Sequence, residues 1–455
     1  MNPQSRRILW VAIVASFIAF LDGSIVNVAL PAITADLDGG LALQQWVVDA
    51  YLLTLGSLIL VAGSLSDNFG RVRILRLGVI GFGLASLMCA VAPTGGVLIA
   101  ARGFQGVAGA LLIPSSLALI TSHFDGPAQS KAIGTWTAWT GTSFLAGPLL
   151  GGVLVDAFSW RWIFAVNIVP VAVTLWLIAR LHEVEEPRIG RHVDYVGATL
   201  AVVGLGGPVF ALIEQARLGW THPGVWIPLV VGVAAFAAFL WWEYRTAHPM
   251  MPLGIFKARS FLIGNIATIG IYGGLSLGVF TLTLFLQEVA GFSATKTGLA
   301  TIPVTVMTIA FAGLFGGLAG RWGARWFMAA GPMICGLGFL LLTAASDPVS
   351  VWIDIVPGVL IFGFGLAVTV APLTASVLGS ISADQAGIGS AINNAVSRVA
   401  GLIMIALAGV IAGSTLDYDS FDRVIYVAAG LLIASGIIAG IGVQNPPHAA
   451  RIPPS

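Results

Sequence analysis

The chain has 455 residues, of which 57% are hydrophobic and 9% are charged, and its formal net charge is +1 at pH 7. Soluble domains carry about 25% charged residues, so this composition excludes a soluble globular protein, and the small net charge gives no support to nucleic-acid binding. An integral membrane protein remains. The apolar runs are about 20 residues long, which favours spanning helices over the roughly ten-residue strands of a barrel.

Fourteen apolar runs are long enough to cross a bilayer. In chain order they are 8–33, 43–65, 74–93, 95–120, 129–155, 162–181, 195–214, 223–243, 260–288, 296–319, 326–346, 351–373, 385–412 and 423–443. Six precede residue 183, six follow residue 259 and two lie between. The pattern predicts an all-α polytopic protein with an N-terminal six-helix bundle (1–182), an inserted two-helix segment (183–259) and a C-terminal six-helix bundle (260–455).

The basic residues predict the orientation of these spans, because cytoplasmic loops carry an excess of Lys and Arg. With a cytoplasmic N-terminus, most of the 21 basic residues fall on the inner side. These inner residues are Arg6, Arg7, Arg71, Arg73, Arg76, Lys131, Arg180, Arg188, Arg191, Arg245, Lys257, Arg259, Arg321, Arg325 and Arg451. We therefore expect a multi-pass protein of the plasma (inner) membrane, acting as a monomer, with both termini cytoplasmic.

Three charged residues lie inside the first, second and fourth spans: Asp22, Asp49 and Arg102. At a rise of 1.5 Å per residue, Asp22 is about 21 Å from the start of its span, in the outer half of a core about 30 Å thick. Asp49 and Arg102 enter their spans from the outer side and reach a depth of about 6–10 Å. Because isolated charges in lipid cost several kcal/mol, we expect the three to face an interior and meet one another.

A buried carboxyl group is suited to carry a proton. Burial favours its neutral form, whereas a neighbouring arginine favours the ionised form. An arginine that approaches Asp22 in one conformation only would couple protonation to shape, which makes Asp22 and Arg102 the predicted proton-coupling residues. The alternative is a fixed Asp22–Arg102 ion pair that holds helices together. Asp49 is a further candidate, either for a second proton or for the charge of a cationic substrate.

A short charged stretch, 63–73, separates the second and third spans. Its spacing is Gly63-x-x-x-Asp67-x-x-Gly70-Arg71-x-Arg73, and a weaker copy occupies 316–325. The stretch predicts a loop in which the two glycines allow a tight turn and close backbone approach. Asp67, at the end of a helix where the helix dipole disfavours a negative charge, needs a cationic partner such as Arg71. The alternative is an ordinary charged inner loop, which the second copy makes less favourable.

The fifth span contains Gly147, Pro148, Gly151 and Gly152. Proline inside a helix kinks it, and the glycines open a groove in which another helix can pack closely. Such a tight contact can seal one face of a cavity.

Other polar and aromatic residues within spans are candidates for lining a substrate cavity: Gln105, Trp136, Trp139, Phe285, Asn394 and Arg398. The chain has no phosphate-binding Gly-Lys-Ser/Thr loop, and its six histidines do not fall at metal-ligand spacings. We therefore expect no metal and no cofactor. Both cysteines, Cys89 and Cys335, lie in apolar runs and are expected to be buried packing residues.

Taken in order, these motifs resemble the major facilitator superfamily, and more narrowly its fourteen-span drug/proton antiporters, the EmrB/QacA-like group. The stretch 63–73 is similar to the superfamily's loop motif, which acts in gating. Leu21–Pro31 resembles the group's first-span motif, whose aspartate is tied to proton coupling. Arg102–Gly106 resembles the fourth-span motif, and Gly147–Gly152 the antiporter motif of the fifth span. The second loop copy departs from the pattern because Gly320 stands where the first has Asp67.

The resemblance implies a proton-coupled secondary transporter that exports hydrophobic compounds, cationic ones among them, by alternating access of two six-helix halves. It would draw on the proton gradient and would not be an enzyme. The alternative of the same fold is a dedicated exporter of one endogenous metabolite or lipid, or a proton symporter. A non-transporting scaffold or sensor is a third possibility, against which the charges at matched depth argue.

Overall fold

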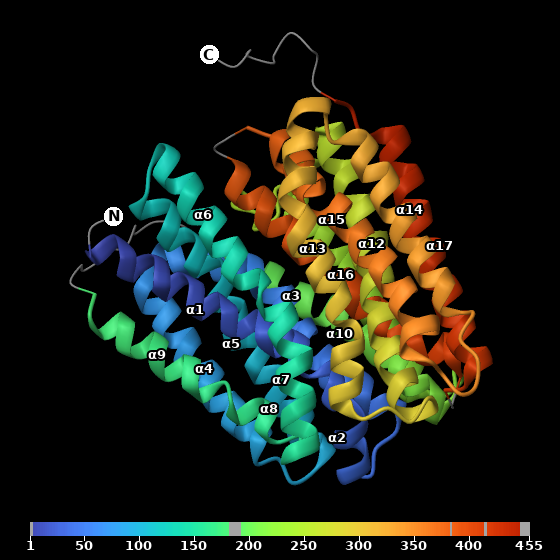
Figure 1. The fold of residues 1–455 in the computed structure, drawn as a ribbon. Helices are drawn as coiled ribbons and strands as arrows, with labels where there is room; N and C mark the ends of the chain where they lie inside the picture. The colour runs from blue at the N-terminus through green and yellow to red at the C-terminus, as the bar shows by residue number, and fades with distance from the viewer. Residues whose placement is uncertain (1–2, 182–192, 383–384, 414–415, 446–455) are drawn as a thin grey trace. The chain divides into compact units, whose positions relative to one another are not determined.

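The structure is a computed structural model of the chain, and it describes residues 3–181, 193–382, 385–413 and 416–445. Within these ranges the regular secondary structure is helical throughout and includes no strand. Fourteen helical segments are long and apolar enough to cross a membrane. The predicted all-α fold class and the number of spans are therefore confirmed (Figure 1).

The first half of the chain contains the following elements: α1 (Pro3–Ile25), η1 (Asn27–Ala29), α2 (Leu30–Asp36), α3 (Leu41–Phe69), α4 (Arg71–Ala90), α5 (Gly95–His123), α6 (Gly126–Gly141), α7 (Ser143–Ala157), α8 (Trp162–Ala165), α9 (Ile168–Ala179), α10 (Tyr195–Leu218) and α11 (Pro223–Arg245). The second half contains η2 (Leu253–Lys257), α12 (Arg259–Leu284), η3 (Phe285–Val289), α13 (Ala294–Trp322), α14 (Arg325–Leu342), η4 (Val351–Ile355), α15 (Val356–Gly379), α16 (Ala386–Ala412) and α17 (Tyr418–Gly442). Five of the spans join two or three of these elements end to end.

The chain divides into two compact units. Unit 1 comprises Met1–Pro252, Phe280–Leu299 and Leu402–Ser420, and unit 2 comprises Leu253–Val279, Ala300–Gly401 and Phe421–Ser455. This division differs from the predicted one, because the inserted helices α10 and α11 group with unit 1 and four later helices pass from one unit into the other. The predicted domains 1–182, 183–259 and 260–455 stay a prediction, and the boundary at 182 lies outside the described residues.

In unit 1, α3 and α5 pack closely because small residues at their contact let the two backbones approach. A side chain at Gly106 would collide with the backbone of Tyr51, and Thr54 on α3 donates its hydroxyl to the carbonyl oxygen of Gly103 at 2.8 Å. Tyr51 also donates to the carbonyl oxygen of Ala19 on α1 at 3.2 Å. In the absence of a hydrophobic driving force between helices in lipid, such close approach and interhelical hydrogen bonds stabilise the bundle.

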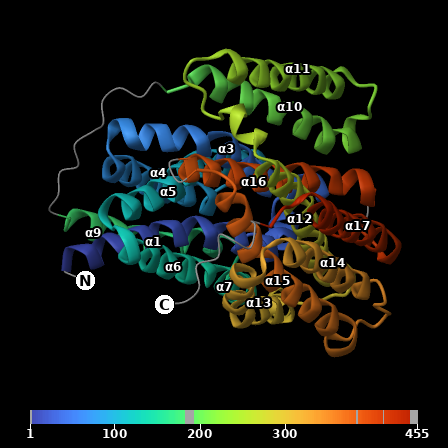
Figure 2. The same ribbon diagram turned by 90° about the horizontal axis from the view of Figure 1, so that it is seen from above.

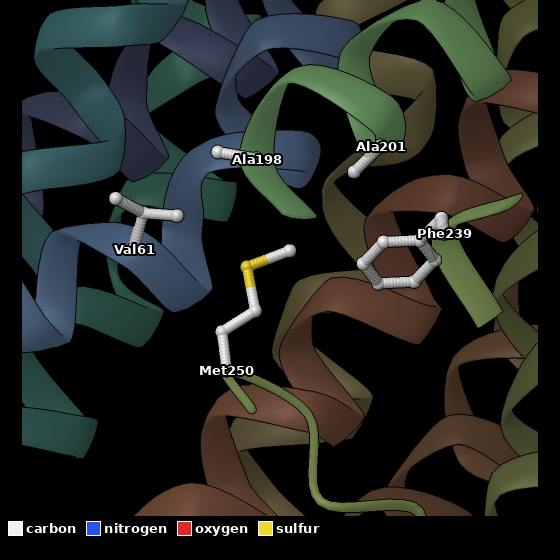
Figure 3. Close-up of a cluster of buried hydrophobic side chains, with 5 residues drawn as sticks. All are labelled: Val61, Ala198, Ala201, Phe239 and Met250. Carbon is white, nitrogen blue, oxygen red and sulfur yellow. The ribbon is translucent and has the colours of Figure 1, made fainter. Parts of the chain in front are cut away.

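The inserted pair, α10 and α11, packs against α3 (Figure 2). Gly204 and Gly207 of α10 lie against Phe236 and Gly232 of α11, so the two helices touch along their backbones. Where the pair meets α3, five buried side chains form a cluster (Figure 3): Val61, Ala198, Ala201, Phe239 and Met250. This cluster lies at the end of unit 1 that carries Gly70, called the loop end below.

Unit 2 is also built on contacts at small residues. Gly338 and Gly365 let α14 and α15 approach, and Cys335 is buried at that contact. Gly274 of α12 lies against Ala428 of α17. Both cysteines are buried and free, which confirms their predicted place in the core.

Candidate functional site

A buried ion pair joins α1 and α5 in unit 1. Asp22 is 0% exposed, Arg102 is 1% exposed, and Arg102 Nη1 donates to Asp22 Oδ2 at 2.5 Å. Gln105, one turn further along α5, donates to Asp22 Oδ1 at 2.9 Å and accepts from Arg102 Nη1 at 2.6 Å. Asn167, which precedes α9, donates to Asp22 Oδ1 at 3.0 Å. The predicted meeting of Asp22 and Arg102 is present, whereas their role in proton coupling remains a prediction.

Arg102 also contacts a backbone carbonyl and two aromatic rings. Its Nε donates to the carbonyl oxygen of Val47 on α3 at 2.9 Å. The guanidinium carbon lies 4.5 Å from the centre of the Tyr51 ring and 5.6 Å from that of Phe164. Such cation–π contacts stabilise a desolvated cation by about 2 kcal/mol. Arg102 therefore keeps favourable partners on α3 and α8 even when Asp22 is neutral.

Two members of this network, Asn167 and Ser86, were not among the predicted site residues. Ser86 on α4 accepts from Gln105 Nε2 at 2.9 Å and from Asn167 Nδ2 at 3.4 Å. Asn167 is fully buried, and its Oδ1 has no hydrogen-bond partner among the described residues. In the sequence, Asn167 is a single amide in an otherwise apolar run. A single polar residue of this kind does not show which helix its side chain faces.

Asp49 on α3 differs from Asp22. It is also 0% exposed, but neither of its carboxylate oxygens has a hydrogen-bond partner within the described part of the chain. The expectation that all three charges meet is therefore wrong for Asp49. The reason is geometric: Arg102 reaches α3 through the backbone of Val47, and the Asp49 side chain does not join it.

The loop end carries the stretch 63–73. The sequence predicts a loop over the whole stretch, but α3 continues to Phe69 and α4 begins at Arg71, so only Gly70 is non-helical. Gly70 has φ of +92°, which favours glycine and confirms the predicted tight turn. The helix therefore extends further than expected, and Leu65 within it packs against the cluster between α3 and the inserted pair.

Asp67 has the partner that its position demands. Arg71 Nη2 lies 3.4 Å from Asp67 Oδ1, and both side chains are largely shielded from solvent. Arg73 is exposed. A Cβ added to Gly63 would meet nothing within 4 Å, so the expected close approach at this glycine is absent from the described structure. The gating role of Gly63, Asp67, Gly70, Arg71 and Arg73 remains a prediction.

The second copy of the stretch lies in unit 2 and uses the same turn. Gly323, with φ of +91°, separates α13 from α14. Without an acidic residue at position 320, Arg325 instead donates its Nε to the carbonyl oxygen of Gly440 at 2.6 Å. The two copies therefore share the backbone reversal and differ in what holds the arginine.

The glycines of the fifth span contact other helices of unit 1. A Cβ on Gly147 would collide with Ser24, and one on Gly151 would lie 2.9 Å from the carbonyl oxygen of Ile25, so both pack against α1. A Cβ on Gly152 would lie 2.6 Å from the carbonyl oxygen of Ala294 at the start of α13. These glycines therefore form the predicted tight helix contact.

The span that contains Pro148 is interrupted at Thr142, between α6 and α7. The break lies further from the proline than the carbonyl of residue 144, with which its ring would clash, so Pro148 does not by itself account for it. At the far end of α7, Asp156 accepts from the backbone amides of Ala294 and Thr295 at 3.2 and 2.8 Å. Asp156 was not among the predicted site residues, and it fastens α7 to α13 at the end of unit 1 opposite Gly70.

The residues predicted to line a cavity have different surroundings. Gln105 is fully buried in the Asp22 network, and Phe285 is fully buried against Tyr418, with ring centres 5.2 Å apart. Trp136 donates its indole N–H to Ser16 at 3.0 Å, and the exposed Trp139 lies 5.3 Å from Trp10. Their role in substrate binding remains a prediction.

Asn394 and Arg398 lie one turn apart on α16 in unit 2, and both are half-buried. Asn394 Nδ2 donates to the carbonyl oxygen of Ser390 at 3.1 Å. Within the described ranges no group of three or more His, Cys, Asp or Glu side chains is arranged to hold a metal ion. The prediction that the protein needs no metal or cofactor stays a prediction.

Fourteen membrane-spanning helices with charged residues buried at depth define a polytopic membrane transporter. The chain belongs to the Major Facilitator Superfamily, whose family model matches residues 12–405. It is 36% identical over 406 residues to the multidrug resistance protein Stp of Mycobacterium tuberculosis (strain CDC 1551 / Oshkosh), covering 88% of this chain and 74% of that protein. It is 33% identical to the puromycin resistance protein pur8 of Streptomyces alboniger, covering 99% of this chain and 94% of that protein.

Solved structures confirm the fold. The POT family transporter PepTSo matches with a TM-score of 0.70, covering 97% of this chain and 98% of that chain at 16% identity. A D-xylose-proton symporter matches with a TM-score of 0.69 and the same coverage, at 14% identity. At these identities the match concerns the fold alone. The predicted relationship to drug-resistance transporters of this superfamily is shown by the sequence relatives.

Proposed function

We propose that this transporter exports hydrophobic compounds, cationic ones among them, in exchange for protons that move inward. The observation that carries the proposal is the fully buried Asp22 with three side-chain donors, Arg102, Gln105 and Asn167. Relatives whose names state resistance to several drugs, to puromycin and to methylenomycin A support export rather than uptake.

Asp22 would carry the proton, and Arg102 would sense it. In the ionised state Asp22 accepts from Arg102, Gln105 and Asn167, so the network favours the carboxylate. Protonation removes the charge that attracts Arg102, which then relies on the Val47 carbonyl and the Tyr51 ring. The pair therefore has two states that differ in how firmly α1 is bound to α5, which is the bistable element that coupling requires.

Asp49 would serve a second proton or the positive charge of a substrate. A buried carboxyl group without a partner is costly, so a ligand that supplies a proton or a cation there gains binding free energy. The absence of a hydrogen-bond partner for either oxygen among the described residues supports this role.

Alternating access would proceed by rocking of two halves. The tight contacts of Gly147, Pro148, Gly151 and Gly152 with α1 and α13 would seal the outer side, and the stretch 63–73 would gate the cytoplasmic side. Both termini would be cytoplasmic, as the distribution of Arg and Lys supports; residues 1–2 and 446–455, with Arg188, Arg191 and Arg451, lie outside the described ranges. The protein would work as a monomer in the plasma (inner) membrane and draw on the proton gradient without a cofactor.

The free energy of one proton moving down its gradient is enough to keep the internal concentration of an exported compound low. One proton moving through about 150 mV supplies about 3.5 kcal/mol, at 2.3 kcal/mol per 100 mV. That free energy corresponds to a concentration ratio of a few hundred.

The test is substrate-induced proton release from the purified full-length protein in weakly buffered detergent solution. Puromycin and a lipophilic cationic dye such as ethidium are the probes. We expect proton release with the wild type and one proton fewer with Asp22→Asn, in which only a second proton at Asp49 would remain. Undiminished release in Asp22→Asn would contradict the assignment of the proton to Asp22, and binding of one compound out of a broad panel would favour a dedicated exporter instead.

A further inference from the structure

A second acidic site, made of the half-buried Asp194 and the buried Glu243, lies away from the Asp22 network, at the loop end of the inserted helix pair. Asp194 precedes α10, and its Oδ1 accepts from the backbone amide of Gly197 at 2.8 Å. Both of its oxygens accept from the indole N–H of Trp242 on α11, at 2.9 and 3.0 Å. Asp194 therefore caps α10 and ties it to α11.

Glu243, the residue after Trp242, is 2% exposed. Its Oε2 accepts from the backbone amide of Met251 at 2.8 Å. Its Oε1 is buried and has no hydrogen-bond partner among the described residues. A buried acceptor without a partner costs about 1–3 kcal/mol, and more when it is charged.

The two carboxyl groups meet over Gly197. A Cβ built on this glycine would lie 2.6 Å from Asp194 Oδ2 and 2.7 Å from Glu243 Oε1. Glu243 Oε1 and Asp194 Oδ2 thus both lie next to the position that a Cβ of residue 197 would occupy. Only glycine leaves that position empty.

The groups that face this pair bring no positive charge within the described residues. The hydrophobic cluster at this junction contains Leu58, Val61 and Leu65 of α3, and Met250 and Met251 from the connection after α11 (Figure 3 shows Val61 and Met250). Arg245, the basic residue of α11, is exposed with its guanidinium 6.0 Å from the Trp241 ring centre. Tyr195, Tyr244 and His248 are exposed as well.

Two adjacent carboxylates, one of them buried, with no cation to compensate them among the described residues, cannot both ionise without a large cost. One bound proton removes this repulsion, because a protonated Glu243 Oε1 can donate a hydrogen bond to Asp194 Oδ2. We propose that Asp194 and Glu243 form a proton-binding site that holds one shared proton, taken from solvent at the loop end of unit 1.

The shared proton would fasten three segments together. They are the start of α10, the end of α11 and the connection through Met251, and they pack on α3 just before Asp67. Loss of the proton leaves two like charges in contact and loosens this junction. The attachment of the inserted helices to α3 therefore becomes sensitive to pH on the side that carries Gly70, independently of Asp22.

The test compares Glu243→Gln with a matched control, Glu214→Gln, on the full-length protein in lipid. Glu214 lies at the other end of the same helix pair and also accepts from an indole N–H, that of Trp46, at 3.0 Å. It differs in having a cation, since Arg217 donates to it at 2.8 and 3.0 Å. The matched pair thus separates a carboxyl group without a cation from one that has it.

Two readouts are made between about pH 5 and pH 8: proton uptake, and hydrogen exchange of the segment around Met251 corrected for the intrinsic pH dependence of exchange. We expect wild type and Glu214→Gln to share a proton step and to lose protection at Met251 as pH rises. Glu243→Gln should bind one proton fewer and keep constant protection.

A second variant, Asp194→Asn, keeps the proposal testable if Glu243→Gln does not fold. It leaves Glu243 without a charged neighbour, so the proton step should move rather than vanish. The double variant R191Q/H192Q tests for a basic partner outside the described residues, and the step should survive it. A Glu243→Gln protein that titrates like wild type, or loss of the step in R191Q/H192Q, would overturn the proposal.

Discussion

Asp22 and Asp49 are two fully buried aspartates on neighbouring helices of unit 1, and they have opposite surroundings. Asp22 accepts hydrogen bonds from Arg102, Gln105 and Asn167, whereas Asp49 accepts none within the described ranges. Asp22 is surrounded by hydrogen-bond donors, whereas Asp49 is a buried acid whose oxygens have no partner in the described part of the chain. The comparison teaches that equal burial does not imply equal chemistry, because the partners decide which protonation state is favoured.

The largest effect is expected for Asp22→Asn. Without a group that carries the proton, the variant cannot use the gradient, so accumulation should fall from a ratio of a few hundred to about 1. Uptake of a cationic dye into inside-out vesicles with an imposed pH gradient measures this. Glu214→Gln is the control. Accumulation in Asp22→Asn that an uncoupler still abolishes would refute the role of Asp22.

Arg102→Leu should cause the largest loss of stability. It leaves Asp22 buried without its cation, and breaking a buried pair in this way costs about 3–5 kcal/mol. The apparent melting midpoint in detergent, followed by size-exclusion chromatography, measures the loss. The double variant Asp22→Asn with Arg102→Leu should lose less than the sum of the single variants, because the pair is coupled. Additive losses would show that the two residues act separately.

Asp49→Asn should not lower the melting midpoint, since the side chain has no hydrogen bond to lose among the described residues. Transport should nevertheless fall, about tenfold for cationic compounds, if the loss of one charge contact costs about 1.4 kcal/mol. Puromycin, a cationic dye and an uncharged compound are compared in the vesicle assay. A loss confined to cations assigns Asp49 to the substrate, a loss for all assigns it to a second proton, and no loss removes it from the site.

The smallest effect on transport is expected for Asn167→Ala. One of the donors to Asp22 is lost, which costs about 1.5–3 kcal/mol for a hydrogen bond to a charged group. Coupled transport should persist, and the pH profile of the rate should change, because Asp22 loses one of its donors. The pH profile of dye uptake measures the change. An unchanged profile would make Asn167 a packing residue only.

Sequence reasoning was sufficient for the features that depend on local composition. Run length and hydropathy predicted fourteen spans, and the glycine at position 70 predicted the turn that the structure shows with φ of +92°. Matching depth predicted that Asp22 and Arg102 meet, because few partners are available to a charge inside the bilayer.

The same reasoning failed where the direction of a side chain matters. Depth places Asp49 beside Arg102, yet its helix turns it away from that network. Run length did not show that α5 directs Gln105 at Asp22 or that Phe285 packs against Tyr418, and the role of both in substrate binding stays a prediction. Rotation of a helix about its axis is set by packing against neighbours, and a hydrophobic run carries little information about it.

The sequence by itself determined the class of protein, the number of spans, the glycine turns and the depth of each charge, because these follow from hydropathy, length and backbone freedom along the chain. Only the tertiary structure decided which buried acid is paired, which is alone, and that Asp194 and Glu243 meet over Gly197. These outcomes depend on contacts between helices far apart in sequence. A rotation of one helix about its axis by a few tens of degrees is enough to move a side chain away from its partner.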